Sequence, residues 1–144
     1  MANIVFGRFL HCSVVVQNDN AATDEEWDRW IALLMEGGAE RAPLMRVLVF
    51  SAGGSPTARQ RGKIHALMPS TGPGVLTAVV IGSPIGRAVV GAMALFNRRV
   101  KAFKPNDVNV AFGYLGIPEA RRRELFQFSR SLHAQLDIPF AASL

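Results

Sequence analysis

Serines and glycines gather at two junctions between a β-branched run and a stretch with helical spacing, and these residue types could bind an anion. Residues 51–56 are Ser-Ala-Gly-Gly-Ser-Pro after the run Val-Leu-Val-Phe, and residues 82–84 are Gly-Ser-Pro after a second apolar run. Glycine N–H groups and helix N-termini favour negative charge, and arginine can bind a phosphate or carboxylate bidentately. The candidate anion-binding residues are therefore Gly53, Gly54, Ser55, Arg59, Ser83 and Arg87.

The same two junctions also suit a simpler structural role, a tight turn followed by a capped helix. Serine is a good N-cap because its hydroxyl accepts a bond from an unpaired backbone N–H, and proline fits the first helical position. We therefore expect Ser55 and Ser83 to be N-caps, and both interpretations of the junctions stay open. If the two strands are parallel neighbours, both helices begin at one sheet edge, with the N–H groups of Gly53 and Gly54 uncovered.

The chain carries no motif that names a reaction, so we expect no enzyme activity, no metal site and no cofactor. Residues 51–56 lack the lysine and spacing of a Walker loop, and no GxSxG nucleophile motif is present. His11, His65 and His133 lie far apart without metal-ligand spacing, and we expect each at the surface or in an interface. Cys12, the only cysteine, has apolar neighbours and is expected in the core. A hydrolase is the least favoured class.

The net charge of +5 at pH 7 raises the question of nucleic-acid binding. The positive residues form small scattered clusters without interleaved aromatic residues, a pattern typical of solvated faces, and we expect no nucleic-acid partner. Residues 72–97 have the length of a membrane span and carry only Arg87 as a charge, but Gly-Ser-Pro at 82–84 interrupts them. We therefore expect no membrane insertion. The N-terminus lacks signal-peptide character, so the expected location is cytoplasmic.

Hydrophobic periodicity predicts alternating strands and helices along the chain. Strands are predicted at residues 4–10, 13–17, 45–50, 75–81 and 100–103, with a hairpin from the first two and the fourth at the centre of the sheet. Helical spacing follows a capping box at residues 23–26 and ends at Gly37-Gly38, and it recurs over 56–68, 85–97, 108–115 and 119–136.

The fold class is therefore α/β, a mixed sheet of about five strands with an N-terminal hairpin, parallel βαβ units and packed helices. Residues 1–144 are expected to form a single domain, with a core at 1–136 and a tail at 137–144 that shows no clear pattern. No internal repeat beyond the two junctions divides the chain.

The predicted helix at residues 85–97 is apolar nearly all round. We expect Gly86 and Gly91 to permit close approach to neighbouring elements. A helix of this composition is either buried by the fold or part of an interface between subunits. A homodimer is expected if this helix, or the one at 119–136, keeps an apolar face uncovered in the monomer.

The order of elements and one phrase near the end of the sheet carry a family resemblance. Residues 100–103 are Val-Lys-Ala-Phe, and Asp107 precedes Val-Asn-Val-Ala-Phe-Gly-Tyr-Leu at 108–115. Over roughly residues 3–115 the chain resembles the STAS superfamily, particularly its bacterial anti-sigma-factor-antagonist-like branch. In that family the phosphoacceptor is a serine that follows an aspartate at the end of the third strand. Here Ser51 and Ser55 occupy this place, and the aspartate has no counterpart.

The resemblance implies a STAS-like, non-enzymatic bacterial regulatory or scaffold module that acts through protein–protein contacts, with Ser51 or Ser55 as the candidate phosphoacceptor. The residues themselves leave a second function open, a small-ligand or anion-binding domain that uses the helix N-termini after the third and fourth strands. A flat apolar surface on the helix at 85–97 or 119–136 favours a protein partner. A concave, glycine-lined pocket at the strand ends favours a ligand.

Overall fold

A computed structural model of the chain describes residues 2–36, 46–67, 75–95 and 99–144. Its sheet has five strands in the spatial order β1-β2-β3-β4-β5. β1 pairs antiparallel with β2, and the other neighbouring pairs are parallel. The predicted α/β class, with an N-terminal hairpin and parallel units in a mixed sheet, is confirmed. The strands are β1 (Ile4–Phe9), β2 (Cys12–Gln17), β3 (Arg46–Ser51), β4 (Leu76–Ile81) and β5 (Val100–Phe103).

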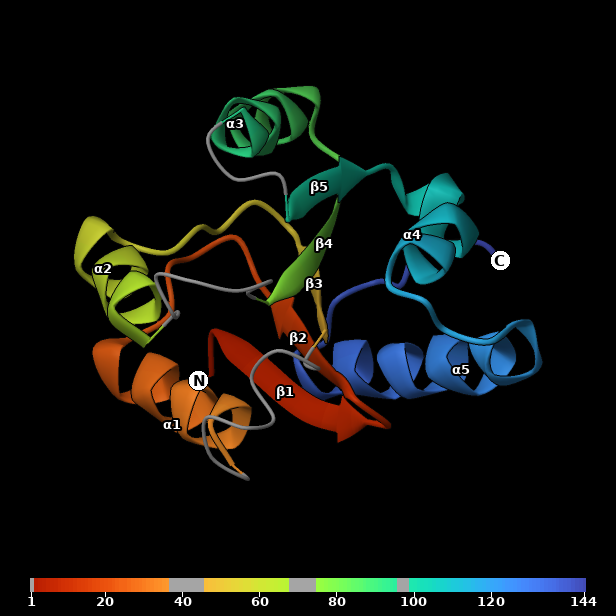
Figure 1. The fold of residues 1–144 in the computed structure, drawn as a ribbon, viewed down its shortest axis with the longest axis horizontal. Helices are drawn as coiled ribbons and strands as arrows, with labels where there is room; N and C mark the ends of the chain where they lie inside the picture. The colour runs from red at the N-terminus through yellow and green to blue at the C-terminus, as the bar shows by residue number, and fades with distance from the viewer. Residues whose placement is uncertain (1, 37–45, 68–74, 96–98) are drawn as a thin grey trace.

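Helices cover both faces of this sheet. Figure 1 shows α1 and α2 on one side of the strands and α4 and α5 on the other, while α3 lies beside the edge strand β5. A short 3₁₀ helix, η2 (Pro105–Asp107), connects β5 to α4. The α-helices are α1 (Asp24–Leu34), α2 (Ala58–Leu67), α3 (Pro84–Ala94), α4 (Val108–Tyr114) and α5 (Glu119–Gln135).

Two separate apolar cores fill the spaces between sheet and helices. On one face, Phe112 of α4 and Leu125 of α5 pack with Leu48 of β3, and all three side chains are fully buried. On the other face, Trp27 and Trp30 of α1 lie against the sheet with their ring centroids 4.8 Å apart. Because both faces are covered, the interior strands carry apolar residues on both sides.

The prediction that residues 75–81 form the central strand is wrong. β3 lies in the middle of the sheet, and β4 lies between β3 and β5. An uncharged run reports only that both faces of a strand are covered, and this condition holds for any interior strand with helices on both sides. β2 meets the same condition, since all six of its residues are buried.

The capping box predicted at the start of α1 is confirmed. The Thr23 hydroxyl accepts a bond of 3.1 Å from the backbone N–H of Glu26, and the Glu26 carboxylate accepts one of 2.9 Å from the N–H of Thr23. The same carboxylate also accepts from the N–H of Asn3 at 2.8 Å. Burial raises the pKa of Glu26, but these backbone bonds outweigh it and hold the pKa below its usual value. The predicted helix end at Gly37-Gly38 lies outside the described residues.

The prediction that Ser55 caps the second helix is wrong, because the helix begins later. α2 starts at Ala58, and the Thr57 hydroxyl accepts a bond of 3.2 Å from the N–H of Gln60. The Gln60 side chain returns a bond, its Oε1 accepting from the N–H of Thr57 at 3.1 Å. This Thr-x-x-Gln pair is itself a capping box, so two N–H groups at the helix start are satisfied without Ser55.

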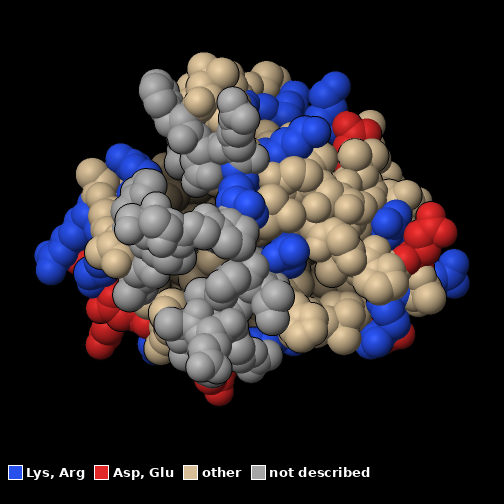
Figure 2. All heavy atoms as spheres, in the orientation of Figure 1, with Lys and Arg blue, Asp and Glu red and all other residues tan. Residues whose placement is uncertain are grey.

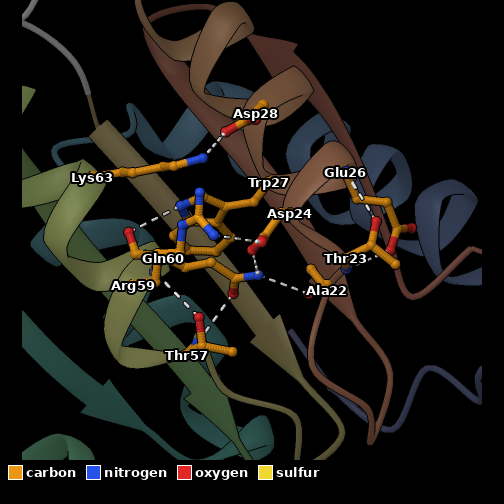
Figure 3. Close-up of polar contacts among 10 residues, drawn as sticks. All are labelled: Ala22, Thr23, Asp24, Glu26, Trp27, Asp28, Thr57, Arg59, Gln60 and Lys63. Carbon is orange, nitrogen blue, oxygen red and sulfur yellow. Dashed lines mark hydrogen bonds and ion pairs between the residues drawn. The ribbon is translucent and has the colours of Figure 1, made fainter.

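Gln60 also ties α2 to α1, as Figure 3 shows. Its Nε2 donates to the Ala22 carbonyl oxygen at 2.8 Å, and its backbone carbonyl oxygen accepts from the indole N–H of Trp27 at 3.1 Å. The residue is only 1% exposed. Two ion pairs at the surface surround the buried Gln60 side chain, Arg59 with Asp24 and Lys63 with Asp28.

The helix α3 is covered on one side only. Ile85 is 78% exposed, Val89 55% and Leu95, just past the helix end, 82%. The expectation for Gly86 is confirmed, since a Cβ there would lie 2.3 Å from Cδ1 of Ile81. For Gly91 it is wrong within the monomer, because a Cβ there meets no described atom within 4 Å. The apolar composition of α3 therefore does not reflect complete burial by this fold.

The segment after α5 packs on the sheet although its sequence has no regular pattern. Phe140 lies against Phe50 of β3 and Phe126 of α5, with ring centroids 5.7 and 4.8 Å apart. The backbone N–H of Ser143 donates to the Pro105 carbonyl oxygen at 3.4 Å. Residues 137–144, expected as a tail beside the core, thus contribute Phe140 to an aromatic cluster over the end of β3.

Candidate functional site

The two strand-to-helix junctions lie side by side at one edge of the sheet. β3 and β4 are parallel neighbours, and Ser51 at the end of β3 is paired in register with Ile81 at the end of β4. The condition for a shared site at this edge is therefore met. A pocket of about 210 Å³ lies there, lined by Ser51, Gly82 and Ser83 on the strand side and by residues 138–142 on the other.

The loop after β3 uses its own hydrogen-bonding groups. The Ser51 hydroxyl donates to the Gly54 carbonyl oxygen at 2.7 Å and accepts from the N–H of Gly53 at 3.1 Å. The N–H of Gly54 donates to the Asn18 carbonyl oxygen at 3.0 Å. The expectation that these glycine N–H groups are uncovered is wrong, because the Ser51 hydroxyl accepts from that of Gly53 and the Asn18 carbonyl oxygen accepts from that of Gly54.

Ser55 and Arg59 do not line the pocket. Ser55 is exposed, and Arg59 reaches toward α1, where its guanidinium lies 3.8 Å from the Asp24 carboxylate. Its side chain is 76% exposed, as Figure 3 places it at the junction of α1 and α2 rather than at the strand ends. Of the two phosphoacceptor candidates, Ser55 offers an exposed hydroxyl, and Ser51 has one that is already bonded in both directions.

At the second junction the predicted cap is confirmed. The Ser83 hydroxyl accepts a bond of 3.2 Å from the N–H of Gly86, with Pro84 as the first residue of α3. Arg87 folds back on the end of β4, where its Nη1 donates to the carbonyl oxygens of Ile81 and Gly82 at 3.1 and 2.9 Å. Of the predicted residues, Ser51 and Ser83 line the pocket, while Gly53, Gly54, Ser55, Arg59 and Arg87 do not.

The N-cap at Ser83 can be tested against Ser55, which does not cap a helix. Ser83→Ala should cost about 0.5–2 kcal/mol because it leaves an N–H of the first turn unpaired, whereas Ser55→Ala should stay within about 0.5 kcal/mol. Urea unfolding of both variants beside the parent protein measures the difference. An equal loss in both variants would contradict the cap positions seen here.

His133, the pocket residue with the most distinctive chemistry, was not among the residues predicted for the site. His133 of α5 is 6% exposed, so the expectation that it lies at the surface or in an interface is wrong. It follows Leu125 and Ser129 at intervals of four, and all three residues lie on the buried face of α5. That spacing was the available signal. His11 is exposed, as expected, and the side chain of His65 lies outside the described residues.

The surroundings of His133 favour a neutral ring. Its Nδ1 lies 2.7 Å from the carbonyl oxygen of Ser129, and its ring packs against Phe50 and Phe140 with centroids 4.9 and 4.6 Å away. Burial lowers the pKa of His133, although the Ser129 carbonyl oxygen opposes this effect. Because that oxygen can only accept, Nδ1 carries the proton of the neutral ring and Nε2 is left as an acceptor.

Charged side chains and other potentially functional residues are scattered over the described part of the chain. Figure 2 shows Lys and Arg side chains over several elements of the visible face, with Asp and Glu among them. Within the described ranges, no three His, Cys, Asp or Glu residues are grouped so as to hold a metal ion. No helix in the part of the chain that the structure describes has the length and apolar character needed to cross a bilayer. Cys12 is fully buried, as predicted, and burial raises the pKa of its thiol to about 12.

No protein-family model, curated protein or solved structure matches this chain. The resemblance to STAS domains therefore rests on the order of the elements and on the phrase at residues 100–115.

Proposed function

We propose that this chain is a non-enzymatic bacterial regulatory or scaffold module, STAS-like, that acts through protein–protein contacts. The observation that carries the proposal is the uncovered apolar face of α3. Soluble domains rarely leave large apolar side chains together on one helix without a partner, because covering them with water is unfavourable.

The exposed residues of α3 follow helical spacing. Ile85, Ala88, Val89 and Ala92 recur at i, i+3, i+4 and i+7, and all four are exposed. Leu95 extends this stripe past the helix end. We call these residues the α3 stripe. They lie on one face of the helix, opposite the face that packs on β4 and β5.

The α3 stripe is suited to a dry contact. Arg87, the only charged residue between Pro84 and Ala94, is bonded to the end of β4. Gly91 leaves open space for the approach of a partner backbone. Full burial of one aliphatic side chain contributes about 1.5–3 kcal/mol, so Ile85, Val89 and Leu95 together could anchor an interface.

The alternative function, a small-ligand or anion-binding domain at the helix N-termini, is supported by the pocket beside Ser51 and Ser83. Its anion-binding form has less support, since the N–H groups of Gly53 and Gly54 are bonded within the protein. Arg87 and Arg59 are likewise engaged away from the pocket.

Val89→Asp tests the protein-contact proposal, and Val110→Asp is its matched control. Val110 lies on α4 and is 58% exposed, close to the 55% of Val89, so the two variants place the same charge at equal exposure. Val89→Asp should abolish partner binding by desolvating a carboxylate in an apolar interface, while Val110→Asp should bind normally.

Two measurements cover the two kinds of partner. Sedimentation velocity of the parent protein and both variants detects a second copy as partner. Cross-linked capture from the source cells, with quantitative mass spectrometry, detects a different protein, and the retained species must be depleted by Val89→Asp alone. A monomer that captures nothing dependent on Val89 would refute the proposal, as would equal loss with Val110→Asp.

A further inference from the structure

The pocket at the end of β3 and β4 has walls of neutral residues. Of the described residues that line it, none is Lys, Arg, Asp or Glu. Phe50 and Val80 form the wall on the strand side, and Ile138 and Phe140 face them from the segment after α5. A charged ligand would lose its hydration here without meeting a counter-charge, so the walls favour an uncharged, mainly apolar occupant.

The volume of the pocket limits the size of the ligand that it can hold. A cavity of about 150 Å³ lined by aliphatic and aromatic side chains is large enough for one benzene molecule. The volume here is about 210 Å³, which leaves room for one aromatic ring with a small substituent. Phe50 and Phe140, which form an edge-to-face pair with ring centroids 5.7 Å apart, offer ring faces and edges for such a molecule.

One buried polar group in the wall is available to the occupant. His133 lines the pocket and is 6% exposed, and its Nδ1 is bonded to the carbonyl oxygen of Ser129. Among the described residues its Nε2 has no hydrogen-bond partner, although the ring is enclosed by Phe50 and Phe140. Nε2 is not one of the side-chain atoms that are fully buried without a partner, so it is open to the pocket, where a ligand can donate a hydrogen bond to it.

We propose that this pocket binds a small uncharged aromatic molecule that donates one hydrogen bond to Nε2 of His133, with phenol as the simplest member of the class. The hydroxyl of Ser83, which also lines the pocket and accepts from the N–H of Gly86, keeps its own proton available to donate. The α3 stripe does not line this pocket, so binding at the pocket can be tested independently of the protein-contact function.

Titrations followed by amide ¹H–¹⁵N spectra test the proposal with three probes: phenol, toluene and benzoate. Phenol should shift the resonances of Ser51, Gly82 and Ser83 with a Kd of about 1 mM or tighter. Toluene, which fills the same space without a donor, should bind about three- to tenfold more weakly. Benzoate should not bind, because its carboxylate would be buried without a partner.

Two variants separate the roles of the ring and of the space. His133→Phe keeps an aromatic ring between Phe50 and Phe140 but removes the acceptor, so phenol should fall to the affinity of toluene while toluene is unchanged. Ala142→Phe lies in the half-buried segment beside the pocket and should fill it, so both probes should weaken at least about tenfold.

The outcomes are distinct. No shift at the pocket residues up to about 10 mM phenol would overturn the site itself. Equal binding of phenol and toluene, or phenol binding that His133→Phe leaves unchanged, would overturn the role of His133. Tighter binding of benzoate than of phenol would overturn the uncharged class. If His133→Phe does not fold, the comparison of phenol with toluene on the parent protein and on Ala142→Phe decides.

Discussion

Replacing Gln60 with alanine should destabilise this protein by about 2–5 kcal/mol, a large part of the stability of a domain of this size. Gln60 is almost fully buried, and its side chain bonds the N–H of Thr57 and the carbonyl oxygen of Ala22. In the alanine variant, the carbonyl oxygen of Ala22 and the N–H of Thr57 would both lose their partner, and a cavity would form between α1 and α2. Each of these effects acts in the same direction.

Urea unfolding monitored by circular dichroism measures this loss, and Arg59→Ala is the control. Arg59 is the neighbouring residue on α2, but its side chain is 76% exposed and its ion pair with Asp24 is 3.8 Å long. Exposed pairs of this kind contribute little, so Arg59→Ala should change stability by less than about 0.5 kcal/mol. A Gln60→Ala variant no less stable than Arg59→Ala would show that the α1–α2 junction is held by its apolar contacts alone.

Gly54→Ala should destabilise the protein by about 2–4 kcal/mol, because there is no room for a methyl group at this position. A Cβ on Gly54 would lie 2.3 Å from the carbonyl oxygen of Asn20 and 2.7 Å from that of Asn18. Both are backbone atoms, so the loop must move, and the bond from the N–H of Gly54 to Asn18 would be lost or strained. The glycine is thus required for packing against residues 18–20.

Gly62→Ala is the same substitution at another position, and it should change the stability of the protein in the opposite direction. Gly62 lies within α2, and a Cβ there meets no described atom within 4 Å. Alanine costs less backbone entropy in a helix, so this variant should be more stable by about 0.5–1 kcal/mol. Thermal unfolding of the two variants side by side provides the measurement. Equal effects at positions 54 and 62 would show that the loop after β3 adapts more freely than its contacts indicate.

The contacts of Gly54 bear on the function of the loop at residues 51–56. Its glycines and serines are the residue types of an anion cradle, and composition alone could not distinguish that role from close packing. The structure shows the packing: Ser51 closes the loop on Gly54, and Gly54 docks on Asn18. Ser51 and Ser83 therefore both lie at the strand ends, while the N–H of Gly53 is bonded to Ser51 and that of Gly54 to Asn18.

Local signals in the sequence predicted two helix starts correctly, and in both the partner residues lie close together along the chain. The capping box from Thr23 to Glu26 and the cap at Ser83 each depend on residues three positions apart, and both are present. The N-cap of α2 was misplaced at Ser55, because the prediction rested on the Ser-Pro pair and did not consider the Thr-x-x-Gln pattern at residues 57–60. Gln60 also reaches Ala22, a contact with a distant segment that no local pattern predicts.

By itself, the sequence determined the alternation of strands and helices, the hairpin and the parallel units, because periodicity and turn residues act over a few positions. It also predicted that the two junctions share one edge if their strands are parallel neighbours, and the pairing of β3 with β4 meets this condition. Only the tertiary structure decided what fills that edge. Residues 138–142 show no regular sequence pattern, yet they cover the strand ends and enclose His133 together with Phe50. The sequence could not predict these contacts, because they join segments about 90 positions apart and no local spacing encodes them.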